Sequence, residues 1–208
     1  MDSFNLIPKL TLDHEDFEAC AKLLGCSVDA VKAVSLVETN GGGFNPDGYP
    51  KTLFEGHYFS RLTDHLYDKD YPTISYPKWT KQFYCKNWKD EHARLVLAST
   101  LDQEAALRSA SWGMFQIMGD NYKLCGFDDV IQFVNAMCEG ASHHLEAFTQ
   151  YVINRHLNDE LQNLEWADFA RQYNGPGQVD VYSKLLSDAY EKVEHAPGAD
   201  PEDAKNET

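Results

Sequence analysis

Apolar residues recur at three- and four-residue spacing over most of the chain, which is the pattern of amphipathic helices. The first such run covers residues 13–24, and Gly25 directly after it is a suitable helix C-cap. Ser27 is a good N-cap for a second helix over residues 28–39, which we expect to stop at Gly41–Gly43. The pattern therefore predicts two short consecutive helices near the N-terminus.

Residues 44–90 lack this periodicity and are rich in aromatic side chains. Four prolines divide them into turns and short segments, because proline is excluded from the interior of helices and of central strands. We predict a short β-hairpin or an irregular lobe in this stretch, with one helix around residues 57–66.

Helical periodicity then returns and continues almost to the C-terminus. The helices that it predicts cover residues 90–101, 102–108, 127–137, 141–157, 166–173 and 179–193, with a break at 109–113. The sequence thus predicts a mainly α fold, in which a helical lobe and a smaller irregular or β-containing lobe flank a groove. One domain is expected over residues 1–193. Residues 194–208 are acidic and lack periodic apolar positions, so we expect a solvated tail.

The composition is that of a folded protein with an acidic surface. Hydrophobic residues make up 43% and aromatic residues 12% of the 208 positions, enough to fill a core, and no apolar run is long enough to span a bilayer. The formal net charge of −15 argues against binding to nucleic acid and against a polybasic membrane anchor. Residues 1–10 lack the basic flank and apolar stretch of a Sec signal, so we expect synthesis in the cytoplasm.

The cysteines and histidines point to no cofactor. Five cysteines at irregular spacing do not form a disulfide framework, and we expect reduced structural thiols. None has an adjacent histidine that would suggest a cysteine amidase or peptidase. The histidines match no metal-ligand spacing, and His-Glu-x-x-His is absent from the sequence, so we predict no metal site.

Glu38 is the residue whose position suggests catalysis most directly. Val31, Val34 and Glu38 are spaced so that they share one face of the predicted helix, which places the carboxyl group on the apolar side. Burial and the negative end of the helix dipole both disfavour ionisation and raise the pKa of such a group. A carboxyl group that stays protonated near neutral pH can act as a general acid. The alternative is a glutamate at the helix end that turns outward and is solvated.

Two further segments combine polar side chains with turn-forming residues. Within residues 109–119, Gln116 lies between apolar neighbours and must find hydrogen-bond partners or face a cleft. This segment is also compatible with a tight turn between two packed helices. Tyr173 and Asn174 precede Gly-Pro-Gly at a predicted helix end, which is compatible with simple turn chemistry.

Together these segments resemble the lysozyme superfamily, as in goose-type lysozymes and lytic transglycosylases, and more closely the N-acetylmuramidase domain of phage and prophage endolysins. Leu-Phe-Glu-Gly-His at 53–57 and Ser-Trp-Gly-x-Phe-Gln-Ile-Met-Gly at 111–119 are long enough to make chance agreement remote. The other segments that carry the resemblance are Ala33–Thr39 and Tyr173–Gly177. It extends over roughly residues 12–190.

The resemblance implies a lysozyme-like fold and a role for each matching residue. Glu38 becomes the general acid and Glu55 the second carboxylate of a glycosidase pair. A structural Glu55, paired with Arg61 or His57, is the alternative. The resemblance also implies that a sugar-binding groove is lined by Ser111, Gln116, Tyr173 and Asn174.

The implied activity is hydrolysis of the β-1,4 bond between N-acetylmuramic acid and N-acetylglucosamine in peptidoglycan. A lytic transglycosylase, which needs only the acid and forms a 1,6-anhydro product, is one alternative, and a catalytically inactive glycan-binding module is the other. We expect a monomer whose partner is the glycan strand. The resemblance further implies an enzyme that waits in the host bacterial cytoplasm, reaches the periplasmic peptidoglycan with the help of a separately encoded holin, and releases phage progeny by lysis.

Overall fold

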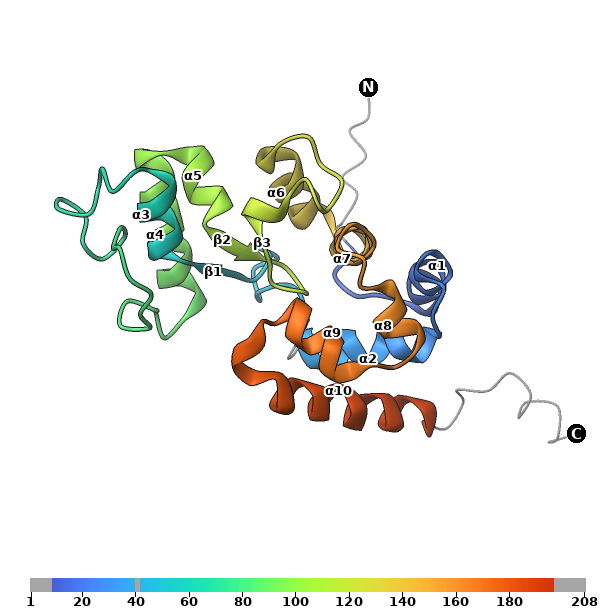
Figure 1. Ribbon diagram of the computed structural model, residues 1–208. Helices are drawn as coiled ribbons and strands as arrows, with labels where there is room; N and C mark the ends of the chain where they lie inside the picture. Colours follow the sequence, from blue (N-terminus) through green and yellow to red (C-terminus); the bar gives the residue numbers. More distant parts are fainter. Residues whose placement is uncertain (1–8, 40–41, 197–208) are drawn as a thin grey trace, which may run out of the picture. The chain divides into compact units, whose positions relative to one another are not determined.

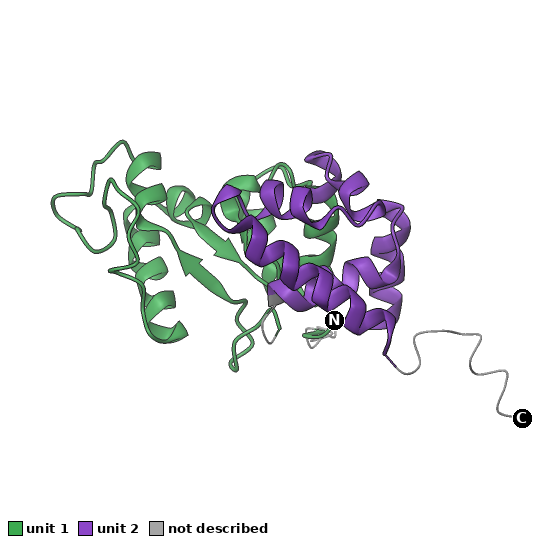
Figure 2. Cartoon of the chain, turned by 60° about the horizontal axis from the view of Figure 1, so that its bottom comes forward, with its two compact units in different colours: residues 1–12, 41–151 green, residues 13–40, 152–208 purple. Residues whose placement is uncertain are grey.

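The structure is a computed structural model that describes residues 9–39 and 42–196 (Figure 1). The chain divides into two compact units, which Figure 2 shows in separate colours. We call residues 1–12 and 41–151 the sheet-containing unit and residues 13–40 and 152–208 the helical unit. Within the described ranges, no helix is long and apolar enough to cross a membrane.

The helical unit consists of helices joined by short turns. Its elements are α1 (His14–Leu24), α2 (Val28–Thr39), α8 (Asn158–Gln162), α9 (Trp166–Tyr173), a 3-10 turn (Pro176–Gln178) and α10 (Val179–Glu194). Helix α10 packs along both α2 and α9 (Figure 1). The fully buried Leu186 of α10 anchors this packing.

The first two helices begin and end where the capping residues predict. Asp13 forms a capping box with Asp16 at the start of α1, and Gly25 ends that helix in the left-handed conformation with φ +70°. The Ser27 hydroxyl accepts a hydrogen bond from the backbone N–H of Ala30 (3.1 Å) at the start of α2. The expected glycine stop lies partly outside the described residues, since Gly41 is not among them.

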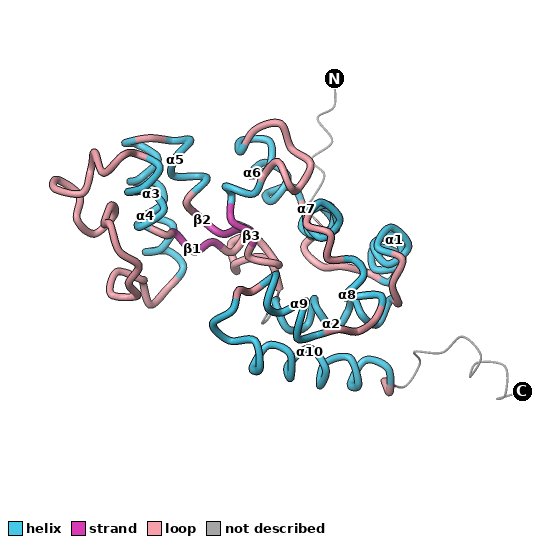
Figure 3. The backbone as a smooth tube through the Cα atoms, viewed as in Figure 1, coloured by secondary structure: helices cyan, strands magenta, loops and turns pink. Residues whose placement is uncertain are grey.

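The sheet-containing unit combines a small antiparallel sheet with several helices. Its elements are β1 (Thr52–Phe54), α3 (Gly56–Leu62), α4 (Trp88–Leu101), α5 (Gln103–Arg108), β2 (Ala110–Trp112), β3 (Ile117–Met118), a 3-10 turn (Gly119–Asn121), α6 (Val130–Glu139) and α7 (Ala141–Asn154), whose last turn crosses into the helical unit. Between α3 and α4 the chain forms a long irregular loop, residues 63–87 (Figure 3).

The prediction of a mainly α fold with a small β-containing part is confirmed, but the origin of the strands differs from expectation. The sheet order is β1-β2-β3, with Leu53 paired to Ser111 and Ser111 paired to Met118. Only β1 comes from residues 44–90. The predicted break at 109–113 is instead the strand β2, which pairs with β1 across more than fifty residues of sequence.

A turn built on Gly113 and Gln116 joins β2 to β3. Both residues have left-handed backbone conformations, with φ +69° and +48°. Gly113 is required for a second reason, because a Cβ at this position would lie 2.9 Å from the ring of His144. The segment is therefore a β-hairpin, and the alternative of a turn between two packed helices is wrong.

His144 of α7 fixes this hairpin to the helices of the same unit. Its Nδ1 accepts a hydrogen bond from the backbone N–H of Met114 (3.0 Å), and its Nε2 lies 2.7 Å from the carbonyl oxygen of Met137. Nδ1 must be unprotonated to accept, so the ring is neutral with its proton on Nε2. The side chain is 1% exposed. Burial lowers the pKa of His144 from 6.5 to about 4, although the Met137 carbonyl opposes this shift.

We expect the free energy of unfolding to decrease as the pH falls from about 6.5 towards about 4, by an amount on the order of 3 kcal/mol from this residue. The unfolded chain binds a proton at His144 in this window, whereas the folded protein does not. Denaturant unfolding at several pH values measures the slope. His144→Leu should reduce the slope and cost about 2–4 kcal/mol at pH 7, because Met114 N–H and Met137 C=O lose their partner.

The control for this experiment is His14→Gln, since the side chain of His14 is 63% exposed. It should leave the acid slope unchanged. A His144→Leu protein with the full slope would contradict the assignment of the slope to His144.

Two further expectations concern the C-terminal tail and the cysteines. Helix α10 ends at Glu194, and residues 197–208 of the predicted tail lie outside the described residues. All five cysteines are free thiols.

Candidate active site

Glu38 lies in the last turn of α2, in the helical unit. Val31 and Val34 of the same helix are fully buried, as the spacing predicts, and Glu38 is itself partly buried. The side-chain N–H of Asn174 donates a hydrogen bond to Glu38 Oε1 (3.0 Å). The alternative of an outward-turned, solvated glutamate is therefore wrong.

The surroundings of Glu38 favour the protonated carboxyl group. Burial raises the pKa of Glu38 above its usual 4.5, and the hydrogen bond from Asn174 offsets part of the rise. The other side-chain atom of Asn174, the buried Oδ1, has no hydrogen-bond partner among the described residues. The raised pKa of Glu38 is therefore due to its burial, and Asn174 limits the rise while holding the carboxyl group in place.

The end of α9 holds Asn174 in this position. Its backbone N–H donates to the carbonyl of Ala170 (2.9 Å), and Gly175 follows with φ +89°. Tyr173 stacks on Phe169 with ring centroids 5.3 Å apart. The Tyr-Asn-Gly-Pro-Gly segment is a helix-ending turn, as its composition suggests, but its asparagine side chain also binds the candidate acid.

Glu55 lies in the sheet-containing unit, between β1 and α3. Its carboxylate accepts a hydrogen bond from the Tyr84 hydroxyl at Oε1 (2.6 Å), and Oε2 lies 3.2 Å from His57 Nδ1. Of the two structural partners considered for Glu55, the structure selects His57. The guanidinium group of Arg61 lies instead over the ring of Tyr58, 4.1 Å from its centroid.

The backbone at Glu55 is held from several sides. Its N–H donates to the carbonyl of Ser109 (2.8 Å), which extends the β1-β2 pairing by one residue. Gly56 allows a close approach of the loop, because a Cβ there would lie 2.3 Å from the ring of Tyr76. Glu55 is the N-cap residue of α3 but makes no side-chain capping bond, so its carboxylate is available for other partners.

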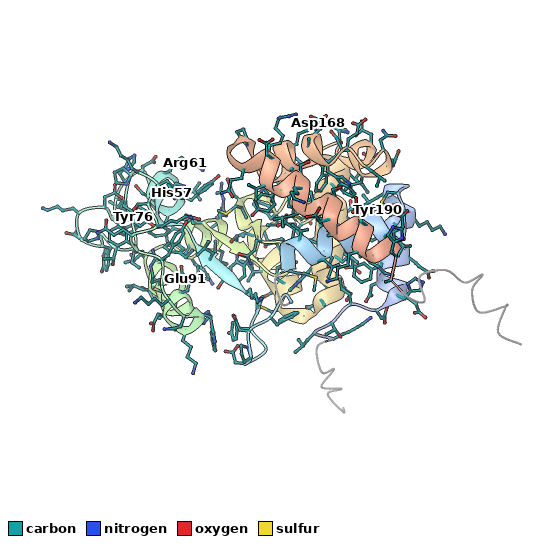
Figure 4. All side chains as sticks on the ribbon, turned by 90° about the horizontal axis from the view of Figure 1, so that it is seen from below. His57, Arg61, Tyr76, Glu91, Asp168 and Tyr190 are labelled. Atoms are coloured by element: carbon teal, nitrogen blue, oxygen red, sulfur yellow. The ribbon has the colours of Figure 1, made fainter. Side chains whose placement is uncertain are left out.

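A buried ion pair supports this turn from α4. Glu91, which is 4% exposed, accepts hydrogen bonds from the backbone N–H groups of Phe54 (3.1 Å) and Cys85 (3.0 Å) and from Arg94 Nη1 (2.8 Å). Figure 4 labels Glu91 together with His57 and Tyr76, whose side chains come from three segments of the same unit. Glu91 therefore connects α4, the end of β1 and the end of the loop that carries Tyr84.

Ser111 and Gln116 are brought together by the hairpin. The Ser111 hydroxyl donates to Gln116 Oε1 (2.9 Å), and Gln116 Nε2 donates to the carbonyl of Gly113 (2.9 Å). Ser111 is 7% exposed, whereas Gln116 is exposed. Both side chains brace the hairpin, which accounts for the polar amide among apolar neighbours. Their contact with sugar stays a prediction.

Tyr84 and Glu91 were not singled out from the sequence. Glu91 could have been found, since Glu91, Leu95 and Ala98 share the buried face of α4 at helical spacing. Tyr84 comes from the irregular loop, where no periodicity indicates which of many aromatic residues faces a carboxylate. Among the described residues, no group of three or more histidine, cysteine or acidic side chains is placed to hold a metal ion.

Comparison with known proteins gives a family match and a similar solved structure. A model of the N-acetylmuramidase family matches residues 27–194. Among solved structures, the chain is similar to the Burkholderia AP3 phage endolysin, with 35% sequence identity and a TM-score of 0.81 over 88% of this chain and 70% of that chain. No match to the chain is found among curated proteins. The family match includes every candidate site residue described above.

Proposed function

We propose a catalytic mechanism on the premise that the chain belongs to the N-acetylmuramidase family, and is therefore a peptidoglycan-degrading enzyme. The family resemblance found in the sequence is confirmed by these matches. The reaction that we propose is hydrolysis of the β-1,4 bond between N-acetylmuramic acid and N-acetylglucosamine.

Glu38 is the general acid of this proposal. The observation that carries the assignment is the burial of a carboxyl group at the end of α2, where one side chain, Asn174, donates a hydrogen bond to it. Cleavage of a glycosidic bond requires a proton on the leaving oxygen as the bond to the anomeric carbon breaks. A protonated Glu38 donates that proton to the leaving sugar and becomes the carboxylate to which Asn174 donates.

Glu55 is the second carboxylate of the proposal. The hydroxyl of Tyr84 donates to one of its oxygens, and His57 lies beside the other. A second carboxylate can stabilise the oxocarbenium-like transition state or activate water, whereas a lytic transglycosylase needs only the acid. The presence of Glu55, held by the Tyr84 hydroxyl, therefore supports hydrolysis over the anhydro-forming reaction.

Digestion of purified peptidoglycan, followed by mass spectrometry of the released muropeptides, tests the reaction. We expect reducing N-acetylmuramic acid ends in the products. Products lighter by one water would identify a transglycosylase. A protein that binds the wall and releases nothing would be a glycan-binding module, and the proposal would be wrong.

Glu55→Gln should lower the rate of peptidoglycan cleavage by about 10²-fold or more, because the amide carries no negative charge for the transition state. The rate per folded molecule is compared with that of the wild type. Tyr84→Phe is the companion variant: it removes one donor from the carboxylate and should cost about tenfold. If Glu55 is only structural, Glu55→Gln will lower the melting temperature and leave that rate unchanged.

Asn174→Ala should move the alkaline limb of the activity profile to higher pH. The bond from Asn174 lowers the pKa of Glu38, so its removal raises that pKa and keeps the acid protonated to higher pH. The expected displacement is about 0.5–1 pH unit, measured as kcat against pH. Asn163→Ala, an exposed helix-end asparagine of the same unit, is the control. An unchanged limb in Asn174→Ala would show that Glu38 does not set it.

The biological setting follows from the same proposal. We propose that the protein acts as a monomer at the end of a phage cycle, when it passes from the host cytoplasm through a holin pore to the periplasmic peptidoglycan. The similar solved structure is that of a phage endolysin, which supports this role. Expression in a bacterial host with and without a pore-forming protein tests it. Lysis that is equally rapid without the pore would contradict the need for a holin.

A further inference from the structure

The second part of the loop between α3 and α4, residues 71–87, has a charge opposite to that of the whole chain. It contains three lysines and no acidic residue, whereas the chain has a formal net charge of −15. Trp79 in this loop is 59% exposed, and the lysines on either side of it, Lys78 and Lys81, are exposed as well. The loop therefore presents a cationic and aromatic surface.

This surface adjoins Glu55 through Tyr84. The hydroxyl of Tyr84 donates to Glu55, and the backbone N–H of Tyr84 donates to the carbonyl of Lys81 (3.1 Å). Burial and the Glu55 carboxylate raise the pKa of Tyr84, and a hydrogen bond from Trp79 opposes that rise. The Nζ atom of Lys81 lies 5.8 Å from the centroid of the Trp79 ring. Trp79 and Lys81 thus lie within one or two side chains of the second candidate carboxylate.

Packing of the loop does not account for the exposure of Trp79. Other aromatic residues hold the base of the loop: Tyr76 is buried and contacts Phe83, with ring centroids 4.9 Å apart. Trp79 leaves most of its ring in water, which is costly for the largest aromatic side chain. An exposed indole with a polar edge is suited to stack against a ligand that has both an apolar face and polar groups.

We propose that Trp79, with Lys78 and Lys81, forms a binding subsite for peptidoglycan beside Glu55. The indole stacks on the C–H face of a sugar ring, and the two ammonium groups pair with carboxylates of the peptide stems. Both features belong to one polymer, because peptidoglycan joins uncharged amino-sugar rings to peptides with free carboxylates. The inference rests on the proposed function, since it gives the same site an additional substrate contact.

Binding without turnover tests the inference. The Glu38→Gln protein, which should bind without cleaving, is co-sedimented with two insoluble probes. One probe is purified sacculi, and the other is the same sacculi after their free carboxylates have been converted to neutral amides. Trp79→Ala in this background should weaken binding to both probes by about 3- to 10-fold. The Lys78→Gln/Lys81→Gln pair should weaken binding only to intact sacculi, by about two- to fivefold, and the difference should vanish at high salt.

Matched controls come from the same unit. Leu66→Ala removes an apolar side chain of the same loop that is 68% exposed, and Lys123→Gln removes an exposed lysine that lies 5.7 Å from the ring of Tyr122. Neither should alter binding. Equal binding of Trp79→Ala and Leu66→Ala would overturn the inference. A Trp79→Ala protein that binds sacculi normally but no longer binds anionic phosphatidylglycerol vesicles would also overturn it. That result would identify a membrane-binding surface instead.

The wild-type protein separates this inference from the proposed function. If the wild type cleaves sacculi and Trp79→Ala binds them normally, only the subsite is wrong. If the wild type releases nothing but its binding depends on Trp79, the hydrolase mechanism is wrong and the binding surface is supported.

Discussion

Glu38→Gln will reduce the cleavage of purified peptidoglycan by about 10²–10⁴-fold, which is the usual contribution of a general acid. The substitution keeps the shape of the side chain and removes its transferable proton. In the wild type, burial raises the pKa of Glu38, which favours the protonated form that a general acid needs. Release of reducing ends from sacculi, expressed per folded molecule, measures the loss.

The fold should survive this substitution, because the partner of Glu38 suits an amide. Asn174 offers one donor, Nδ2, and one buried acceptor without a partner among the described residues, Oδ1. A glutamine at position 38 has the complementary acceptor and donor, so both atoms of the asparagine amide can be satisfied.

The raised pKa of Glu38 also predicts the direction in which Glu38→Gln changes the stability of the fold. Because the pKa of Glu38 is raised in the folded state, the unfolded chain ionises first, and the folded state loses stability as the pH rises above the ordinary value of 4.5. Glutamine does not ionise and avoids this loss. Glu38→Gln should therefore be as stable as the wild type at pH 7, or slightly more stable, in thermal unfolding.

An exposed glutamate of the same unit provides the control. Glu18 of α1 has a side chain that is 57% exposed, and Glu18→Gln should retain full activity. Full activity in Glu38→Gln, with the fold verified by circular dichroism, would remove the basis for the proposed mechanism.

The helices could be predicted from the sequence because their signals are local. Helix α9 covers residues 166–173, as expected, since its apolar positions and the following Asn-Gly-Pro-Gly turn lie within a few residues of each other. Helices α6 and α7 begin or end about three residues from their predicted bounds, and the short α8 (Asn158–Gln162) lies in a stretch for which no helix was predicted.

The sheet could not be predicted in the same way. Strands β2 and β3 contain three and two residues, too few for an alternating pattern to be visible. The hydrogen-bond partners of β2 lie in β1, far away in sequence, so nothing local marks residues 110–112 as a strand. The left-handed conformation of Gln116 could not be predicted from the sequence either, because glutamine is not a typical residue for positive φ.

The candidate site was only partly accessible from the sequence for a related reason. Helical spacing identified Glu38, but the same criterion applies to Glu91 of α4, which also shares a buried face. Helical spacing indicates which carboxyl groups are buried, whereas their hydrogen-bond partners determine what each group can do chemically. Glu38 faces an amide that can accept as well as donate, whereas Glu91 faces only donors. Partners that come from distant segments, such as Tyr84 for Glu55, are known only once the chain is folded.

Glu91→Gln should therefore have the opposite outcome to Glu38→Gln. The three groups that bind Glu91 are the N–H groups of Phe54 and Cys85 and the guanidinium of Arg94, and all of them donate. A glutamine must turn its own NH₂ group towards at least one of these donors, and it leaves the Arg94 charge without a counterion. The side chain of Arg94 is 11% exposed, so solvent compensates little. We expect a loss of about 2–4 kcal/mol in the free energy of unfolding.

Denaturant unfolding of the full chain measures this loss, and the rate of peptidoglycan cleavage per folded molecule completes the contrast with Glu38→Gln. That rate should stay within about tenfold of the wild type, because Glu91 acts on the backbone before Glu55 and holds no transferable group. Glu104→Gln is the matched control: Glu104 pairs with Arg108 at 3.2 Å, but its side chain is 69% exposed, and the change should cost less than about 1 kcal/mol. A Glu91→Gln protein as stable as Glu104→Gln would contradict this expectation. It would mean that the buried pair of Glu91 with Arg94 contributes no more to the free energy of unfolding than an exposed ion pair.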